Sequence, residues 1–385
     1  MTVKKQVLFF IESLQCGGAE KSLISLLPLL DYSKMEVDLL LLKRGGVFEQ
    51  YIPENIRIID FHQQVHPLLF LPSQTMFSLR LRWNRLIARK EHGAETRWKT
   101  MHHAYTPLAK HYDIAIAYQQ GFPTYYLVDK VNAGKKIAWA NVDLTQAGYC
   151  VRYNRAFYNK YDKVVAVSAN LQKMLAEEGF ASSDKIAVVQ DILNVNLIRE
   201  MATQSDFSKH PSGLTLITVG RMVYQKGYDL AVEAADILRN QGLDFHWYFV
   251  GDGAMRETIE KLIREQHLEN HITLLGEQSN PYPFMAVADI YVQTSRFEGF
   301  GITLAEARII GKPVISTNFP VVYNQIADSQ NGLIADMTPD SIAEKIMLLA
   351  RDTQLREHII HNISLEHNAT AEVESAKVNR LIVHP

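Results

Sequence analysis

Residues 214–220 read LTLITVG, a short apolar run that ends in glycine and precedes a longer helical pattern. Similar runs recur further along the chain: FHWYFVG at 245–251, ITLLGE at 272–277, DIYVQTS at 289–295 and PVISTN at 313–318. Short runs of this kind that alternate with amphipathic segments are typical of βαβ units and a parallel sheet. The second half of the chain is therefore predicted to form one α/β domain.

The first half repeats this alternation less regularly. We expect its strands near residues 6–13, 36–42, 56–60, 113–118, 136–140, 164–168 and 186–189, with helices between them. A polar stretch without periodicity, at about 200–213, looks like a linker. We predict a first domain over 1–205, a second over 206–363, and a C-terminal helix over 364–385 that can cross back to the first domain.

The size and composition of the chain favour a globular enzyme. A chain of 385 residues exceeds one ordinary core, which argues for two domains with a cleft between them. The apolar content of 47% and the charged content of 21% are typical of a soluble protein. Because the formal net charge of -2 gives no general attraction to nucleic acid, we expect no nucleic-acid partner.

Cysteine usage and hydropathy indicate the compartment. Cys16 and Cys150 lie far apart without a C-x-x-C spacing, which argues against a disulfide framework and favours a reducing cytoplasm. The apolar run near the N-terminus contains Glu12 and precedes no small-residue cleavage site, so we interpret it as a strand. No stretch approaches the roughly 18 apolar residues that a membrane span needs. We expect a cytoplasmic protein.

The glycine pair Gly17 and Gly18 follows the first predicted strand and precedes an apolar helix. Paired glycines let backbone N–H groups approach an anion at a helix start. A nicotinamide-binding loop would have G-x-G-x-x-G here, and this sequence lacks it. A tight turn is the alternative interpretation.

The loop at 219–227 reads VGRMVYQKG and directly follows a predicted buried strand. Open α/β sheets bind their ligands at the carboxyl ends of such strands. The forked donors of Arg221 and the point charge of Lys226 can neutralise the growing charge of a departing diphosphate. Solvated loop charges are the alternative.

The segment at 295–307 reads SRFEGFGITLAEA. Gly299 and Gly301 open the backbone before a helix whose start favours an anion, and Glu298 stands beside them. Glu306 has largely apolar neighbours on its helix face, and an unpaired buried carboxylate costs several kcal/mol. Its partner is predicted to be the hydroxyls of a ligand such as a ribose, or else an Arg or Lys from another element.

Five segments, taken in order, resemble the retaining GT-B glycosyltransferases of family four: GGAEKS, VGRMVYQKGYDL, VGDGAMRETIEKLI, LLGEQSNPYPFMAVADIYVQTSRFEGFGITLAEA and GKPVISTN. The resemblance is close over most of 214–336 and looser in the first half. It implies an α/β protein of the GT-B fold, two Rossmann-like domains whose parallel sheets face a central cleft. It also implies a hexosyltransferase-type enzyme that moves a sugar from a nucleotide diphosphate, most often UDP, to an acceptor in cell-surface polysaccharide synthesis.

The resemblance also assigns roles by position. Arg221 and Lys226 bind the donor diphosphate, Glu298 lies near the donor sugar, and Glu306 holds the ribose. Further donor contacts carried over in this way are Gly18 at the phosphates, the segment 277–280 with Gln278 at the base, and Gly299, Phe300 and Gly301 at the helix start.

One position departs from the family pattern. Many relatives have a His after a Trp and an apolar residue, whereas here Trp139-Ala140-Asn141 puts Asn at that place. An amide can hydrogen-bond but cannot accept a proton as imidazole does. Asn141 is thus a candidate for positioning, with Asp143 or another residue as an alternative for the role and a strand-end cap as the structural alternative.

Metal-dependent glycosyltransferases commonly hold their cation with a D-x-D element, which this sequence lacks. We therefore predict metal-independent transfer without a cofactor, in which the two loop cations and the helix start stabilise the leaving group. Two histidine pairs, His62 with His66 and His358 with His361, have spacings that suit a metal. No carboxylate or Cys completes either set, so neither is predicted to bind one.

Residues 66–99 are apolar first and then basic. The cations of their second part are Arg80, Arg82, Arg85, Arg89, Lys90, Arg97 and Lys99, against Glu91 and Glu95. Each cation near an anionic membrane surface contributes about 1 kcal/mol. The segment is therefore predicted to rest peripherally on the inner face of the cell membrane, which suits a lipid-linked saccharide acceptor. A solvated helix face is the alternative.

Two other functions stay open. A GT-B-like nucleotide-sugar epimerase would use the same cleft and would consume donor without an acceptor. A catalytically silent nucleotide-sugar-binding subunit is conceivable because of Asn141. The presence of Arg221, Lys226, Glu298 and Glu306 argues against the silent subunit.

Overall fold

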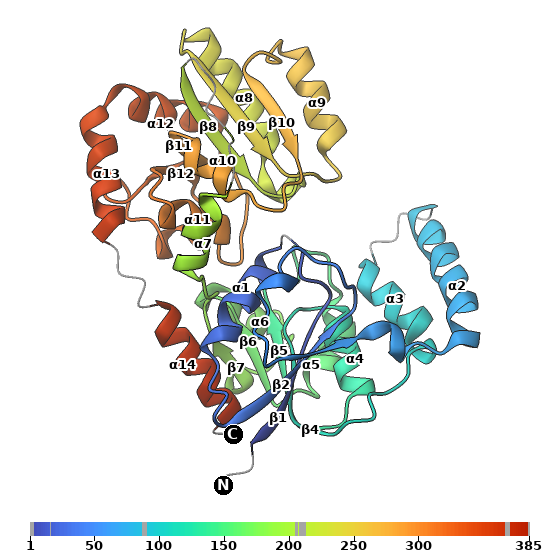
Figure 1. Cartoon of the computed structure of the whole chain (residues 1–385). Helices are drawn as coiled ribbons and strands as arrows, with labels where there is room; N and C mark the ends of the chain where they lie inside the picture. Colours follow the sequence, from blue (N-terminus) through green and yellow to red (C-terminus); the bar gives the residue numbers. More distant parts are fainter. Residues whose placement is uncertain are drawn as a thin grey trace. The chain divides into compact units, whose positions relative to one another are not determined.

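The computed structural model describes residues 4–15, 17–86, 91–204, 207, 213–365 and 370–383. The chain forms two compact units, Met1–Ile192 with Ala369–Pro385 and Leu193–Asn368. Each unit contains one sheet covered by helices (Figure 1). The pairings among the described strands are all parallel, as the alternation of apolar runs and helical segments predicted.

The first unit has a seven-stranded sheet in the order β3-β2-β1-β4-β5-β6-β7. Its strands are β1 (Lys5–Ile11), β2 (Met35–Leu41), β3 (Arg57–Asp60), β4 (Tyr112–Ala117), β5 (Ala133–Ala140), β6 (Lys163–Ala166) and β7 (Ile186–Val188). Side chains such as Phe9, Ile116 and Val165 are fully buried. Strands of a parallel sheet are covered on both faces, which is why their sequences are continuous apolar runs.

The second unit has a six-stranded sheet in the order β10-β9-β8-β11-β12-β13. Its strands are β8 (Leu214–Val219), β9 (Phe245–Val250), β10 (Ile272–Gly276), β11 (Ile290–Gln293), β12 (Val314–Thr317) and β13 (Leu333–Ala335). The apolar runs predicted the first five of these strands but not β13. This edge strand has 3 residues, LIA, which lie between Gly332 and Asp336 in a largely polar stretch.

Helices fill the connections. In the first unit they are α1 (Gly18–Leu26), α2 (Pro67–Leu86), α3 (Gly93–Met101), α4 (Phe122–Lys130), α5 (Val151–Tyr158), α6 (Ala169–Glu177) and α14 (Thr370–Val383). In the second they are α7 (Val195–Ala202), α8 (Tyr228–Asn240), α9 (Arg256–Glu265), α10 (Tyr282–Val287), α11 (Ile302–Ile309), α12 (Pro339–Arg351) and α13 (Thr353–Leu365).

Both sheets reverse their strand order at an equivalent point, between β1 and β4 in the first unit and between β8 and β11 in the second. The connections that leave these two neighbouring strands run in opposite directions across the sheet. Open α/β sheets bind ligands outside the carboxyl ends of the strands at this point. The fold therefore singles out one edge in each unit.

The division between the units falls at 192/193, before α7, and not within the predicted linker at 200–213. Helix α7 belongs to the second unit because its residues bond that unit. Asn280 donates to the Met201 carbonyl at 2.7 Å, and Arg199 donates to the Ile309 carbonyl at 3.3 Å. Residues 205–206 and 208–212 of the expected linker lie outside the described residues.

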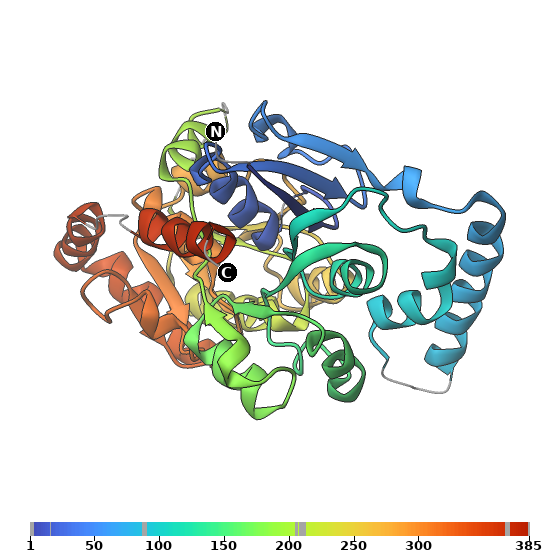
Figure 2. The ribbon, with the colours of Figure 1, turned by 90° about the horizontal axis from the view of Figure 1, so that it is seen from below.

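Helix α14 packs against the first unit (Figure 2). Lys5 Nζ donates to the carbonyls of Ile382 and Val383 at 3.1 and 2.9 Å, which places a cation at the negative end of the helix. At the other end, Glu374 accepts a hydrogen bond from the Gln190 backbone at 3.0 Å. The last helix thus joins the amino end of β1 to the segment after β7.

Candidate functional site

The loops that follow β8 and β11 are hydrogen-bonded to each other. Gln225 donates its side-chain amide to the Phe297 carbonyl at 2.8 Å, and the Thr294 hydroxyl donates to the Lys226 carbonyl at 2.9 Å. Gly227 has a φ of 62°, and a Cβ there would lie 2.0 Å from the Thr294 carbonyl oxygen. Glycine at this position therefore permits the close approach of the two loops.

Two predicted site residues, Lys226 and Glu298, form an ion pair across these loops. Their Nζ and Oε1 atoms are 2.6 Å apart, and their side chains are 18% and 8% exposed. Glu298 Oε1 also accepts from the Ser295 hydroxyl at 2.6 Å and from the Gln293 amide at 3.0 Å. The ion pair and these hydrogen bonds thus offset the cost of burying the Glu298 carboxylate.

Arg221 differs from Lys226 although both belong to one loop. Its side chain is exposed and makes no hydrogen bond or ion pair within the described part of the chain. A Cβ on Gly220 would lie 3.3 Å from Lys226 Cδ, so the lysine chain passes over the residue next to Arg221. The loop therefore presents one neutralised cation and one available cation.

Arg296, which was not among the predicted site residues, holds the two loops together. Its guanidinium bonds Asp229 at 2.6 Å and lies 4.2 Å from the centre of the Tyr224 ring. Its backbone N–H donates to the Gln225 carbonyl at 2.7 Å. Although burial favours the neutral acid, hydrogen bonds from Arg296 hold the pKa of Asp229 below its usual value. The sequence signal was an Arg inside the quoted motif, without an obvious partner nearby.

The predicted glycines lie at the start of α11. Gly301 is the N-terminal cap of this helix and has a φ of 90°, a conformation that favours glycine. The Phe300 carbonyl accepts a hydrogen bond from the Gln325 amide, which holds the loop that contains Gly299. The first turn of α11 contains no acidic residue. Its free N–H groups and positive dipole end are therefore available to an anion.

Two residues predicted to contact the nucleoside, Glu306 and Gln278, already bond protein groups. Glu306 is fully buried, and the Tyr282 hydroxyl donates to its Oε1 at 2.7 Å. A tyrosine hydroxyl therefore bonds one carboxylate oxygen, where the sequence predicted ligand hydroxyls or else an Arg or Lys. The Gln278 amide donates to the Leu275 carbonyl at 2.7 Å, which turns this side chain back toward β10.

Gly18, the predicted phosphate contact of the first unit, is exposed at the start of α1. Gly17 caps this helix, and a Cβ on it would lie 2.0 Å from Glu20 Oε2. The Glu20 carboxylate thus folds back over the helix start, as the glutamate of a capping box does. A phosphate at this point would meet a negative charge. Cys16, in the same loop, lies outside the described residues.

Asn141 follows β5 and is tied to the end of β4. Its Nδ2 donates to the Tyr118 carbonyl at 3.0 Å, and its backbone N–H donates to Gln120 Oε1 at 3.1 Å. Its Oδ1 is buried and accepts no hydrogen bond from the described residues. The Nδ2 group of Asn141 is therefore hydrogen-bonded, whereas its Oδ1 atom accepts no hydrogen bond from the described residues.

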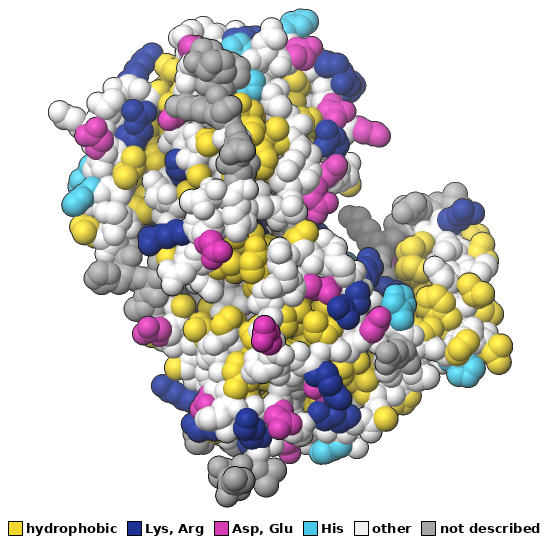
Figure 3. Space-filling view, in the orientation of Figure 1, with side chains coloured by type: hydrophobic (Ala, Val, Ile, Leu, Met, Phe, Trp, Pro, Cys, Tyr) yellow, Lys and Arg dark blue, Asp and Glu magenta, His cyan; other side chains and the backbone are white. Residues whose placement is uncertain are grey.

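The segment at 66–99 forms α2 and the adjacent α3. Along α2, the side chains of Leu68, Leu71, Leu79 and Trp83 are 60% to 80% exposed and follow helical spacing, and hydrophobic side chains gather on this part of the surface (Figure 3).

The charges of the same segment are partly paired. Glu91 bonds Lys99 at 2.5 Å and approaches Arg80 at 3.5 Å. The residues at 87–90 and the side chain of Arg85 lie outside the described residues. The exposed apolar stripe is thus the more prominent feature. None of the described helices is both long and apolar enough to cross a membrane.

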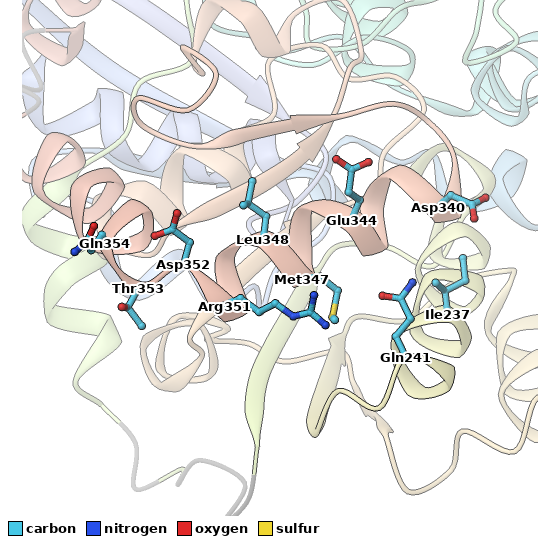
Figure 4. Close-up of a pocket in the computed structure, with 10 residues that line it drawn as sticks. All are labelled: Ile237, Gln241, Asp340, Glu344, Met347, Leu348, Arg351, Asp352, Thr353 and Gln354. Carbon is cyan, nitrogen blue, oxygen red and sulfur yellow. The ribbon is translucent and has the colours of Figure 1, made fainter.

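A groove of about 900 Å³ lies between α8 and α12, away from the predicted site (Figure 4). It is lined by Ile237, Gln241, Asp340, Glu344, Met347, Leu348, Arg351, Asp352, Thr353 and Gln354. Ile237 and Gln241 lie at the carboxyl end of α8, whereas Lys226 precedes its amino end. A helix of 13 residues separates these ends by about 20 Å. The groove is therefore not part of the donor loops.

Neither histidine pair belongs to a cluster of possible metal ligands among the described residues. His358 Nε2 hydrogen-bonds the Asn362 amide at 3.0 Å. Within the described ranges, no group of three or more His, Cys, Asp and Glu side chains is arranged to hold a metal ion.

Comparison with known proteins identifies the second unit. Residues 202–365 match the family of glycosyl transferases group 1. This match lies within the second unit and covers less than half of the chain. The matched region contains the β8 and β11 loops and every donor-site candidate of the second unit.

Two relatives of the chain carry names that state an activity. The poly(ribitol-phosphate) alpha-N-acetylglucosaminyltransferase of Staphylococcus aureus is 31% identical over 197 residues, 46% of this chain and 39% of that protein. The N-acetylgalactosamine-N,N'-diacetylbacillosaminyl-diphospho-undecaprenol 4-alpha-N-acetylgalactosaminyltransferase of Campylobacter jejuni is 24% identical over 377 residues, 96% of each chain. The chain spans only 39% to 57% of the length of several other relatives.

Solved structures show the fold. Anabaena Alr3699/HepE in complex with UDP and glucose superimposes with a TM-score of 0.68 at 19% identity, covering 98% of each chain. At this level of identity the likeness concerns architecture alone. The two parallel sheets are those of the GT-B fold, as the sequence motifs predicted.

Proposed function

We propose that this chain is a retaining glycosyltransferase that moves a sugar from a nucleotide diphosphate, with UDP favoured, to a saccharide or lipid-linked acceptor in cell-surface polysaccharide synthesis. The observation that carries the proposal is the paired β8 and β11 loops, where an available Arg221 adjoins the Lys226–Glu298 pair. The names of these relatives describe the transfer of N-acetylhexosamines to poly(ribitol phosphate) and to a saccharide linked to diphospho-undecaprenol.

In the proposed reaction the bond between the anomeric carbon and the diphosphate oxygen breaks, and negative charge grows on that oxygen. Arg221 stabilises this charge directly. Lys226, which is paired with Glu298, donates a second hydrogen bond to the phosphate. The N–H groups at the start of α11 stabilise the same negative charge. Because these groups supply the positive charge, we propose that transfer needs neither a metal ion nor a cofactor.

The acceptor oxygen attacks from the face that the diphosphate leaves, and its proton passes to the departing diphosphate oxygen. This route retains the anomeric configuration without a covalent enzyme intermediate. Asn141 takes part by orientation, since an amide transfers no proton at neutral pH. Glu306, whose Oε1 accepts a hydrogen bond from the Tyr282 hydroxyl, is the proposed contact for the ribose.

Thermal unfolding with a panel of nucleotide sugars tests the donor assignment, since a ligand of the folded state raises the melting temperature. We expect protection by at least one UDP-sugar, and transfer of its sugar in excess EDTA. An absence of protection by every nucleotide sugar contradicts the proposal. Donor conversion without an acceptor would indicate the epimerase, and protection without turnover would indicate the silent subunit.

We further propose that the chain works in the cytoplasm, held peripherally at the membrane by α2. The exposed leucines and Trp83 supply apolar area at the interface, and the exposed Arg82 adds attraction to anionic lipid. We expect the wild type to sediment with anionic phosphatidylglycerol vesicles. The double variant Leu71→Asn/Trp83→Ala should sediment with them several-fold less. Leu365→Asn, which removes an exposed leucine of α13, is the control. Equal sedimentation of all three proteins contradicts this contact.

A further inference from the structure

A second group of polar side chains gathers at the equivalent edge of the first unit, and the proposed reaction does not use it. Glu12 directly follows β1. Its backbone N–H donates to Gln119 Oε1 at 3.3 Å, and its carbonyl accepts from the Lys43 backbone at 2.8 Å. These bonds fix Glu12 between the ends of β2 and β4, at the point where the strand order reverses.

The carboxylate of Glu12 is partly buried but has no hydrogen bond or ion pair in the part of the chain that the structure describes. Burial raises the pKa of this carboxyl, and the charges of Arg97 and Lys43 act against that rise. Neither Arg97 nor Lys43 lies within ion-pair distance of this carboxylate. A desolvated carboxylate without a hydrogen bond is unfavourable, and a ligand that donates one would relieve this cost.

Two further groups lie against residues 119–122, the segment after β4 to which Glu12 is also hydrogen-bonded. Arg97 Nε donates to the Tyr105 hydroxyl at 3.1 Å, and its guanidinium lies 4.7 Å from the centre of the Phe122 ring. Its remaining N–H groups have no hydrogen bond to the described residues. Gly121 lies shortly after the end of β4 and has a φ of 88°. A Cβ built on this glycine would lie 2.9 Å from the Tyr149 hydroxyl oxygen. Burial and neighbouring charges, that of Glu12 included, raise the pKa of Tyr149.

We propose that Glu12, Arg97 and Tyr149 form the subsite for the sugar hydroxyls of the acceptor, an inference that rests on the proposed function. Adjacent hydroxyls of a saccharide both donate and accept hydrogen bonds. Glu12 accepts from one hydroxyl, while Arg97 and Tyr149 donate to its neighbour. A phosphate at this place would be repelled by Glu12, so the subsite takes a neutral saccharide and not the diphosphate of either substrate.

The test compares Glu12→Gln with Glu36→Gln. Glu36 is exposed near the amino end of β2 and bonds Gln6 at 2.8 Å, so it is a matched carboxylate at the other edge of the sheet. The probes are the UDP-sugar that protects the wild type and the methyl glycosides of glucose, galactose, N-acetylglucosamine and N-acetylgalactosamine. We expect Glu12→Gln to raise the acceptor KM at least tenfold, with the KM of the UDP-sugar and its hydrolysis within twofold. Glu36→Gln changes none of these quantities.

Tyr149→Phe provides a second variant that keeps the ring stacked on His92, whose centre is 3.7 Å away. It should raise the acceptor KM about threefold or more. An acceptor KM within twofold of the wild type in both Tyr149→Phe and folded Glu12→Gln overturns the subsite.

The donor assignment is tested separately by thermal protection. If no UDP-sugar protects the wild type, the proposed function fails, and saturation-transfer NMR with the methyl glycosides decides the subsite alone. Binding that Glu36→Gln retains and Glu12→Gln loses supports it. Absent binding in the wild type, or equal binding in both variants, overturns it.

Discussion

The carboxyl edges of the two sheets share a strand order but differ in charge and bonding. In the second unit the acid, Glu298, is saturated by Lys226, Ser295 and Gln293, and Arg221 is an available cation. In the first unit the acid, Glu12, has no hydrogen bond to its carboxylate among the described residues. One edge therefore offers positive charge, and the other offers an acceptor of hydrogen bonds.

The helix starts at the two edges also differ in negative charge. A carboxylate, Glu20, folds over the start of α1, whereas the first turn of α11 has no acid. The strand order selects where a ligand binds, and the loop residues select its charge. The second unit is thus suited to a diphosphate and the first to a neutral sugar.

The largest effect is expected for the available cation. Arg221→Ala should lower turnover by about 10² to 10³, because one oriented donor to a developing charge has this weight. Steady-state rates with the protecting UDP-sugar measure it. Lys261→Ala, which alters an exposed pair with Glu265 on α9, is the control. Turnover near the wild-type value in Arg221→Ala would contradict the claim that the edge of the second unit supplies positive charge to the diphosphate.

Lys226→Ala should lower turnover similarly but, unlike Arg221→Ala, should also destabilise the protein. It leaves Glu298, which is 8% exposed, without its cation, at a cost of about 1–3 kcal/mol. Arg221→Ala should stay within about 0.5 kcal/mol of the wild type, since its side chain is exposed. Denaturant unfolding compares the two. Equal free energies of unfolding in the two variants would mean that the ion pair does not stabilise the fold.

A third prediction concerns a buried acid of the first unit, Asp191. Burial raises its pKa to about 7, a hydrogen bond with Ser22 opposes this rise, and the nearby hydroxyl of Tyr118 bonds the same serine at 3.0 Å. Because the folded-state pKa lies above the ordinary value, this group stabilises the fold at low pH. That contribution is lost as the pH rises through about 7.

Asp191→Asn should therefore stabilise the protein by about 1–3 kcal/mol at pH 8 and by less at pH 5. Each kcal/mol corresponds to roughly 2–4 °C in melting temperature for a domain of this size. Melting curves at both pH values provide the check. A variant that retains the pH dependence of the wild type would exclude Asp191 as its source.

The smallest effect is expected at the nucleoside contact. Tyr282→Phe removes the hydroxyl that donates to Glu306 Oε1, which should change UDP affinity several-fold at most. Glu306→Gln should weaken UDP binding more, because the ribose hydroxyls lose a charged acceptor. Calorimetric titration separates the two. Unchanged affinity in Glu306→Gln would assign this residue to structure alone.

Much of the fold could be predicted from the sequence because parallel strands are buried on both faces and stand out as apolar runs. The short edge strand β13 gave no such signal. The division before α7 was also missed, since that helix is assigned to the second unit by bonds such as Asn280 to Met201, which lie far apart in sequence.

The site residues could be listed from motifs, but their bonding could not. Lys226 and Glu298 are separated by 72 positions, and their pairing depends on the adjacency of β8 and β11. The clamp by Arg296 and the Tyr282 partner of Glu306 depend on the same three-dimensional arrangement. Glu12 was noted only as an interruption of an apolar run, because nothing in the sequence brings Arg97 and Tyr149 to it.

The central claim, that the β8 and β11 loops bind a nucleotide through its diphosphate, is tested most directly by titrating UDP and uridine into the wild type and Arg221→Ala. We predict that the wild type binds UDP at least tenfold more tightly than uridine and that the variant loses this preference. Equal affinities of the wild type for UDP and uridine, or unaltered UDP binding by the variant, would contradict it.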